Sequence, residues 1–88
     1  MIKLVSASVL HDRVLRLTFS DGSEGDLDFA SILVRDTVLT QRLAESEYFA
    51  TFFLELGALC WSNGLEFSAR SLHENLKKLG ALRHHATA

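Results

Sequence analysis

The first half of the chain alternates apolar and polar positions in the manner of a sheet that is buried on one side. Residues 2–9 contain β-branched side chains in a partly alternating pattern, and residues 14–19 read as a second strand. Leu15, Leu17 and Phe19 share one face of this second stretch, and Val14, Arg16 and Thr18 share the other. Both stretches are therefore predicted to be strands, with the face of Leu15, Leu17 and Phe19 toward the core.

Polar turns separate these strands and introduce a third. His11-Asp12-Arg13 lies between the first two, and Asp21-Gly22 is a tight-turn signal before a strand expected over 23–28. The pattern predicts a three-stranded antiparallel meander with one face in water.

The next segment carries residues that can begin short helical turns. Asp28 can cap a turn over residues 29–33, because its carboxylate accepts hydrogen bonds from free amides. Thr40 can start a turn that buries Leu43, and Ser46 can cap a further one.

A second hairpin is expected after these turns. Residues 52–56 and 58–62 read as strands joined at Gly57, and the second of them ends at Asn63-Gly64. Asn-Gly is favoured where two consecutive residues need positive φ, so this dipeptide predicts a hairpin-type turn. We expect all five strands to form one sheet.

The last element is predicted to be an amphipathic helix. Ser68 is a suitable N-cap for a helix over residues 69–79, and Gly80 suits the position after the helix end. The apolar face of this helix comprises Leu72, Leu76 and Leu79. The fold class is α+β: a meander, short helical turns, a second β-hairpin and a C-terminal helix packed on the sheet. We expect residues 1–80 to form a single domain and residues 81–88 a loose tail.

Composition narrows the class of protein. The chain has 88 residues, a formal net charge of −2 and 48% hydrophobic residues, which is typical of one folded domain. No apolar run reaches the roughly 18 residues that a membrane span needs, and no signal-peptide pattern opens the chain. A single cysteine, Cys60, excludes an intrachain disulfide and favours the cytoplasm.

Several segments resemble the bacterial domain-of-unknown-function 2442 family over nearly the whole chain. They are Phe19-Ser20-Asp21-Gly22-Ser23, Asp28-Phe29 followed by Ile32-Leu33, Leu43 with 47–49, and Trp61-Ser62-Asn63-Gly64-Leu65-Glu66-Phe67 leading into Leu72. Such sequences usually have proline where this chain has Ala69, and tyrosine where it has His73. Because His73 replaces the tyrosine, a role of that tyrosine in the family is not carried over to this chain.

The resemblance implies a small α+β fold without an established activity. It also implies a genomic habit, since relatives are often encoded beside another small protein in toxin–antitoxin-like pairs. An antitoxin-like partner of an adjacent gene product is therefore the function that the resemblance favours.

Aromatic and basic residues are the candidate interaction surface. Tyr48, Phe49, Phe52 and Phe53 are too dense for all four to face inward, and Trp61 is either a ligand or partner anchor or the largest core side chain. Residues 70–88 carry four basic side chains against one acidic side chain. The members of this basic region are Arg70, Lys77, Lys78 and Arg83. They either complement the helix dipole or bind phosphates.

Candidate catalytic and metal-binding groups have simpler structural explanations. Asp26 and Asp28 can share a strand face and hold Mg²⁺ or act as a base, but Asp28 also suits a cap. His84 and His85 are adjacent, which is not the spacing that places two imidazoles on one helix face. Cys60 has no base in a recognisable motif. We expect no catalytic residue, cofactor or metal.

Three functions therefore remain open. The first is a non-catalytic protein-interaction or regulatory module. The second is a nucleic-acid-binding regulator that uses the basic C-terminal helix, and the third is a small ligand-binding or enzymatic domain. A homodimer is also predicted, because so small a sheet leaves apolar edges to cover.

Overall fold

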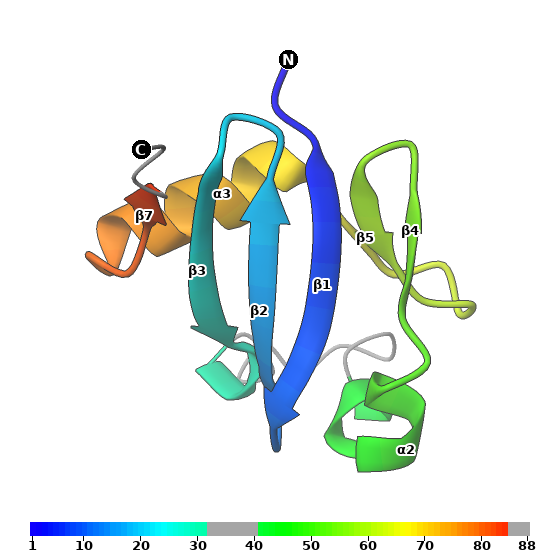
Figure 1. Cartoon of the computed structure of the whole chain (residues 1–88). Helices are drawn as coiled ribbons and strands as arrows, with labels where there is room; N and C mark the ends of the chain where they lie inside the picture. Colours follow the sequence, from blue (N-terminus) through cyan, green and yellow to red (C-terminus); the bar gives the residue numbers. More distant parts are fainter. Residues whose placement is uncertain (32–40, 85–88) are drawn as a thin grey trace.

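The structure is a computed structural model, and it describes residues 1–31 and 41–84. Within these ranges the strands form two antiparallel sheets, and the helix α3 (Ala69–Lys78) crosses behind the first sheet (Figure 1). The molecule is a small α+β fold, as predicted from the sequence. The parts of the expected helical turns at residues 32–33 and Thr40 lie outside the described ranges.

The first sheet contains the predicted meander. Its strands, in spatial order, are β1 (Leu4–His11), β2 (Val14–Phe19), β3 (Ser23–Asp28) and β7 (Arg83–His84). Leu15, Leu17 and Phe19 are buried, which confirms the alternation read from β2. Arg16 lies between them on the other face, and its Nε donates to Asp26 Oδ1 on the neighbouring strand over 2.9 Å.

The chain end differs from the prediction of a loose tail over residues 81–88. β7 pairs with the first two residues of β3, and Arg83 Nε donates to Glu24 Oε1 over 3.1 Å. Gly25 permits this approach, because a Cβ there would lie 2.8 Å from the carbonyl oxygen of Ala81. A strand of two residues leaves no periodic pattern, so its sequence did not reveal it.

The second sheet replaces the expected single five-stranded sheet, and that expectation was wrong. Its strands are β4 (Phe53–Glu55), β5 (Ala58–Cys60) and β6 (Glu66–Phe67). The hairpin β4–β5 stands beside β1, and the Leu4 N–H donates to the Gly57 carbonyl over 2.9 Å (Figure 1). Two sheets and a helix can surround one core, which buries more apolar surface than one open sheet would.

The start of α3 follows the predicted cap. Ser68 has extended backbone, and its Oγ accepts a hydrogen bond from the Ser71 N–H over 3.1 Å. Leu72 and Leu76 are fully buried against the sheets. Capping and amphipathicity together therefore place this helix as the sequence predicted.

The end of α3 buries less than predicted. Gly80 has φ +67°, and its N–H bonds to the Lys77 carbonyl while the Ala81 N–H bonds to the Leu76 carbonyl. This is a Schellman motif, which confirms Gly80 as the residue after the helix end. The chain turns back here, and Leu79, which we expected on the buried face, is 66% exposed.

Short helices connect the two sheets. They are η1 (Phe29–Ser31), η2 (Arg42–Ala44) and α2 (Ser46–Phe49). Asp28 Oδ1 accepts from the Ala30 N–H over 2.9 Å, which confirms that cap, and Leu43 is buried as expected. Ser46 is the first residue within α2 and not its cap; Glu45 is the cap residue, and its side chain makes no capping hydrogen bond.

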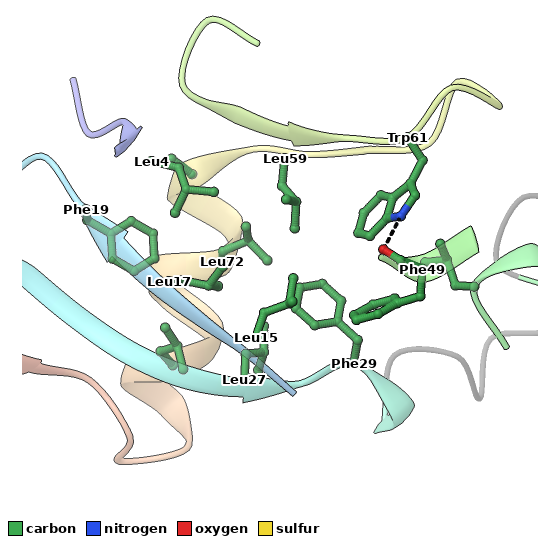
Figure 2. Close-up of a cluster of buried hydrophobic side chains, with 13 residues drawn as sticks. Leu4, Leu15, Leu17, Phe19, Leu27, Phe29, Phe49, Leu59, Trp61 and Leu72 are labelled. Atoms are coloured by element: carbon green, nitrogen blue, oxygen red, sulfur yellow. Dashed lines mark hydrogen bonds between the residues drawn. The ribbon is translucent and has the colours of Figure 1, made fainter. Parts of the chain in front are cut away.

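The core lies between the two sheets and α3 (Figure 2). It is built mainly from leucine and aromatic side chains, and its largest members are Phe19, Phe29, Phe49 and Trp61. Over residues 1–31 and 41–84, no helix has the length and apolar character needed to cross a membrane.

Candidate functional site

Trp61 belongs to the core and not to an exposed surface. It is 2% exposed, and its indole Nε1 donates to the carbonyl oxygen of Phe49, at the end of α2, over 3.0 Å (Figure 2). The rings of Phe29 and Phe67 meet the indole edge-on. The core interpretation is confirmed, and Trp61 is removed from the candidate interaction surface. Its hydrogen bond joins the end of β5 to the end of α2.

Of the other aromatic candidates, Tyr48 and Phe52 are partly buried. The Tyr48 hydroxyl lies 3.1 Å from Ser62 Oγ, and the Arg42 guanidinium lies 4.2 Å from the centre of the Tyr48 ring. Phe52 packs edge-on against the Trp61 ring at 6.4 Å. Phe53 is 43% exposed, which confirms that the four neighbouring aromatics do not all face inward.

The loop after β5 is stabilised by hydrogen bonds of Asn63. Gly64 has φ +95° and donates to the Trp61 carbonyl, whereas Asn63 does not have positive φ, contrary to the prediction for this dipeptide. Asn63 Oδ1 accepts from the Leu65 N–H, and the Asn63 N–H donates to the Tyr48 hydroxyl. A three-residue loop needs only its glycine in the left-handed region, so Asn63 serves through hydrogen bonds.

The basic region of the C-terminal segment is partly neutralised by acidic side chains. Arg70 Nε lies 3.3 Å from Glu74 Oε1 on the same helix. Arg83 pairs with both Glu24 and Asp26 of β3, at 3.1 and 3.6 Å. Lys77 and Lys78 remain on the last turn of α3, where cations favour the helix dipole. The four basic residues are therefore not a single positive surface.

The turn between β2 and β3 carries a polar side chain that contacts three others, Asp21. Asp21 Oδ1 accepts hydrogen bonds from both the N–H and the Oγ of Ser23, and Gly22 follows with φ +85°. Asp21 Oδ2 lies 3.1 Å from His73 Nε2 and 3.8 Å from His84 Nε2. The hydrogen bonds from Ser23, helped by His73, lower the pKa of Asp21 below its ordinary value.

A pocket of about 270 Å³ opens beside this cluster, but the cluster lacks an activated nucleophile. The pocket is lined by His73, Lys77, Gly80, Leu82 and His84. In a nucleophile–base pair the hydroxyl donates to the imidazole. Here the Ser23 hydroxyl and the His73 imidazole both bond to the carboxylate of Asp21, and Ser23 is fully buried. The cluster joins α3, β7 and the turn between β2 and β3.

The remaining chemical candidates are held in structural contacts. Asp26 is bonded by the guanidinium of Arg16, which lowers the pKa of Asp26, and Asp28 caps η1. Burial, followed by the negative charge of Glu66, raises the pKa of the Cys60 thiol, so the thiolate is disfavoured. No group of three metal-ligating side chains forms a metal site among the residues that the structure describes.

Sequence reasoning missed the most unusual residue of the surface, Leu56. Glu55 pairs with Ala58, so β4 and β5 are joined by the two residues Leu56 and Gly57. Both have positive φ, at 52° and 81°, which is the requirement of a type I′ turn. Leucine is disfavoured there, and Leu56 is also 95% exposed. The available signal was Leu-Gly between two short strands, where Asn-Gly or Asp-Gly is expected.

This turn is presented on a fixed support. A Cβ on Gly57 would lie 2.7 Å from Lys3 Cβ, so the hairpin tip packs directly against the start of the first sheet. The Leu4–Gly57 hydrogen bond closes the same contact. Phe53 and Leu54 on β4 are also among the exposed large apolar side chains. We call Phe53, Leu54 and Leu56 the hairpin patch.

Comparison with known proteins gives one family. Residues 4–78 match the family described as "Protein of unknown function (DUF2442)". No curated protein and no solved structure matches the chain.

Proposed function

We infer that this chain, which belongs to the DUF2442 family, acts as a non-catalytic protein-interaction module whose binding element is the hairpin patch. The observation that carries the proposal is Leu56, an exposed leucine held in a left-handed conformation. No contact among residues 1–31 and 41–84 explains why leucine occupies this position.

The energetics of Leu56 favour a role outside the fold. A left-handed conformation costs an L-residue with a Cβ about 1–2 kcal/mol, and asparagine tolerates it better. Burial of a leucine side chain is worth about 2 kcal/mol, and Leu56 gains almost none of this within its own chain. A partner with an apolar pocket would supply that burial. Local strain of this kind is commonly found where a protein binds.

The support of the hairpin favours the same interpretation. Gly57 rests against Lys3 and is hydrogen-bonded to Leu4, so the turn need not become ordered when a partner binds. A pre-ordered anchor loses little conformational entropy on association. Phe53 and Leu54 extend the apolar area along β4. Hot spots of protein interfaces are usually organised as an anchor side chain with flanking contacts.

The first partner to test is the product of the adjacent gene. The chain resembles a family whose members are often encoded beside another small protein in toxin–antitoxin-like pairs. This resemblance motivates the choice of partner and the proposal of an antitoxin-like regulatory role. We place the complex in the cytoplasm, where a lone buried thiol such as Cys60 stays reduced.

Nucleic-acid binding by α3 receives less support. Arg70 and Arg83 are engaged by Glu74, Glu24 and Asp26, and phosphate contacts would have to displace these carboxylates. The net charge of −2 adds no general attraction. A small ligand-binding or enzymatic role is also disfavoured, because Asp26 is held by Arg16, Asp28 caps η1, and Asp21 is bonded by Ser23 and His73.

Co-purification from cells that express the chain together with the adjacent gene product tests the proposal. Leu56→Asn should abolish co-purification while the variant stays folded by circular dichroism. Leu79→Asn is the matched control, since it removes another exposed leucine at the end of α3 and should leave binding intact. Failure of the wild-type chain to co-purify, or equal binding by the Leu56 variant, would contradict the proposal.

A further inference from the structure

The edge strand of the first sheet has a sequence that is symmetric about its centre. Residues Leu4-Val5-Ser6-Ala7-Ser8-Val9-Leu10 read the same in both directions. In an antiparallel pair of two such strands centred on Ala7, every residue lies opposite a residue of its own type. Val5 then faces Val9, and Ser6 faces Ser8. A twofold-symmetric contact requires this kind of self-complementary surface.

The outer edge of β1 is available for such pairing beyond its first residues. Among the strands that the structure describes, β1 is hydrogen-bonded as a ladder only with β2, so its other side is a sheet edge. The β4–β5 hairpin contacts the start of this edge, where Leu4 is buried and bonded to Gly57, so the pairing we consider is confined to residues 5–9. The pairing with β2 is irregular between Leu4 and Ser6 and again after Val9, and it is regular over residues 6–9. The regular stretch includes the centre of the symmetric sequence.

The composition of this edge is also suited to self-pairing. Proteins commonly protect an exposed edge with lysine, proline or an inward-pointing charge. Residues 4–10 contain none of these, and Val5 and Val9 are 56% and 43% exposed. The central residues, Ser6, Ala7 and Ser8, are small.

We propose that β1 pairs with β1 of a second copy of this chain, antiparallel and about a twofold axis at Ala7. The two four-stranded sheets then join into one continuous sheet. The valine pairs contribute apolar contact across the strands, and the serine pairs can hydrogen-bond. None of the residues of this surface belongs to the hairpin patch, so the dimer goes beyond the proposed function.

The expected dimer is weak. A pair of short strands buries less than the area of about 1,200 Å² at which stable interfaces begin. We therefore expect a monomer–dimer equilibrium with a dissociation constant on the order of 10 µM. Sedimentation equilibrium of the full chain over about 2–200 µM measures it directly.

Paired substitutions at the two serines test the register. Ser6 lies opposite Ser8 of the second copy, and both are exposed. In S6E/S8K, each glutamate faces a lysine of the other copy, whereas in S6E/S8E each faces a glutamate. The two variants differ only at residue 8, which pairs with Arg16 of β2, so S6E/S8E adds a favourable contact within the chain.

We expect S6E/S8K to dimerise at least as strongly as the wild type. S6E/S8E should weaken the dimer about tenfold or more, since the twofold axis repeats each unfavourable pair. A wild-type chain that stays monomeric at 200 µM, or equal dimerisation by the two variants, would overturn the proposal. Leu56→Asn should leave the dimerisation constant unchanged, so failure of partner binding and failure of the dimer are separately visible.

Discussion

The turns of this protein differ in what the residue before the glycine does. In the turn between β2 and β3 and in the loop after β5, Asp21 and Asn63 precede glycine and use their side chains to bind nearby amides. In the turn of β4–β5, Leu56 precedes Gly57 and offers no hydrogen bond, although its backbone is the more strained. The first two residues are explained by the folded chain, and Leu56 is not.

Asp21 and Asn63 thus stabilise the fold through their side chains, whereas the side chain of Leu56 does not. The side chain of Asp21 connects Ser23 of the same turn with His73 and His84, which belong to distant parts of the chain. Removal of such a residue should lower stability. Replacement of Leu56 by a turn-forming residue should raise it. Substitutions around these turns therefore test whether the two kinds of turn residue differ in this way.

The largest effect is expected at Trp61, which anchors the loop after β5. Trp61→Ala removes a fully packed ring and the hydrogen bond to Phe49, so the free energy of unfolding should fall by about 3–5 kcal/mol. Urea denaturation followed by circular dichroism measures this loss. A variant of unchanged stability that has lost only partner binding would show that Trp61 belongs to the interface.

Alanine substitutions at two glycines compare the turns directly. Gly57→Ala introduces a Cβ 2.7 Å from Lys3 Cβ in addition to its positive φ, so we expect a loss of about 2–3 kcal/mol. Gly22→Ala has a similar φ but an open environment, and it should cost about 1 kcal/mol. Equal losses in thermal or urea unfolding would show that the β4–β5 turn does not rest on β1.

A smaller, pH-dependent effect is expected from Asp21. The pKa of Asp21 is lowered in the folded protein, chiefly by hydrogen bonds from Ser23. Its contribution to stability is thus complete above its unfolded pKa of about 4 and is lost as the pH falls through the lower folded pKa. Unfolding free energies between about pH 5 and pH 2 should fall less steeply for Asp21→Asn than for the wild type. If the unfolding free energies of Asp21→Asn and the wild type changed equally with pH, Asp21 would not be a source of the pH dependence.

Local patterns predicted those parts of the fold that depend on neighbouring residues. The alternation of Leu15, Leu17 and Phe19 identified β2, and the caps at Asp28 and Ser68 marked the starts of η1 and α3. Each of these signals is contained within a few residues of the chain, which is why it could be read without the structure.

The parts that sequence reasoning missed depend on contacts between distant residues. β7 forms because Gly25 admits the chain beside β3, and two residues carry no periodicity. The division into two sheets depends on which strand edges meet, which no local pattern records. Leu56 escaped notice because an exposed leucine is ordinary in a sequence and becomes unusual only with its backbone conformation.

The most direct test of the central claim is the free energy of unfolding of Leu56→Asn, measured by urea denaturation beside its affinity for the partner. The variant should be more stable by about 0.5–1 kcal/mol, because asparagine tolerates the left-handed conformation, and it should no longer bind. A variant that is less stable than the wild type, or that still binds the partner, would contradict the claim that Leu56 is kept for binding.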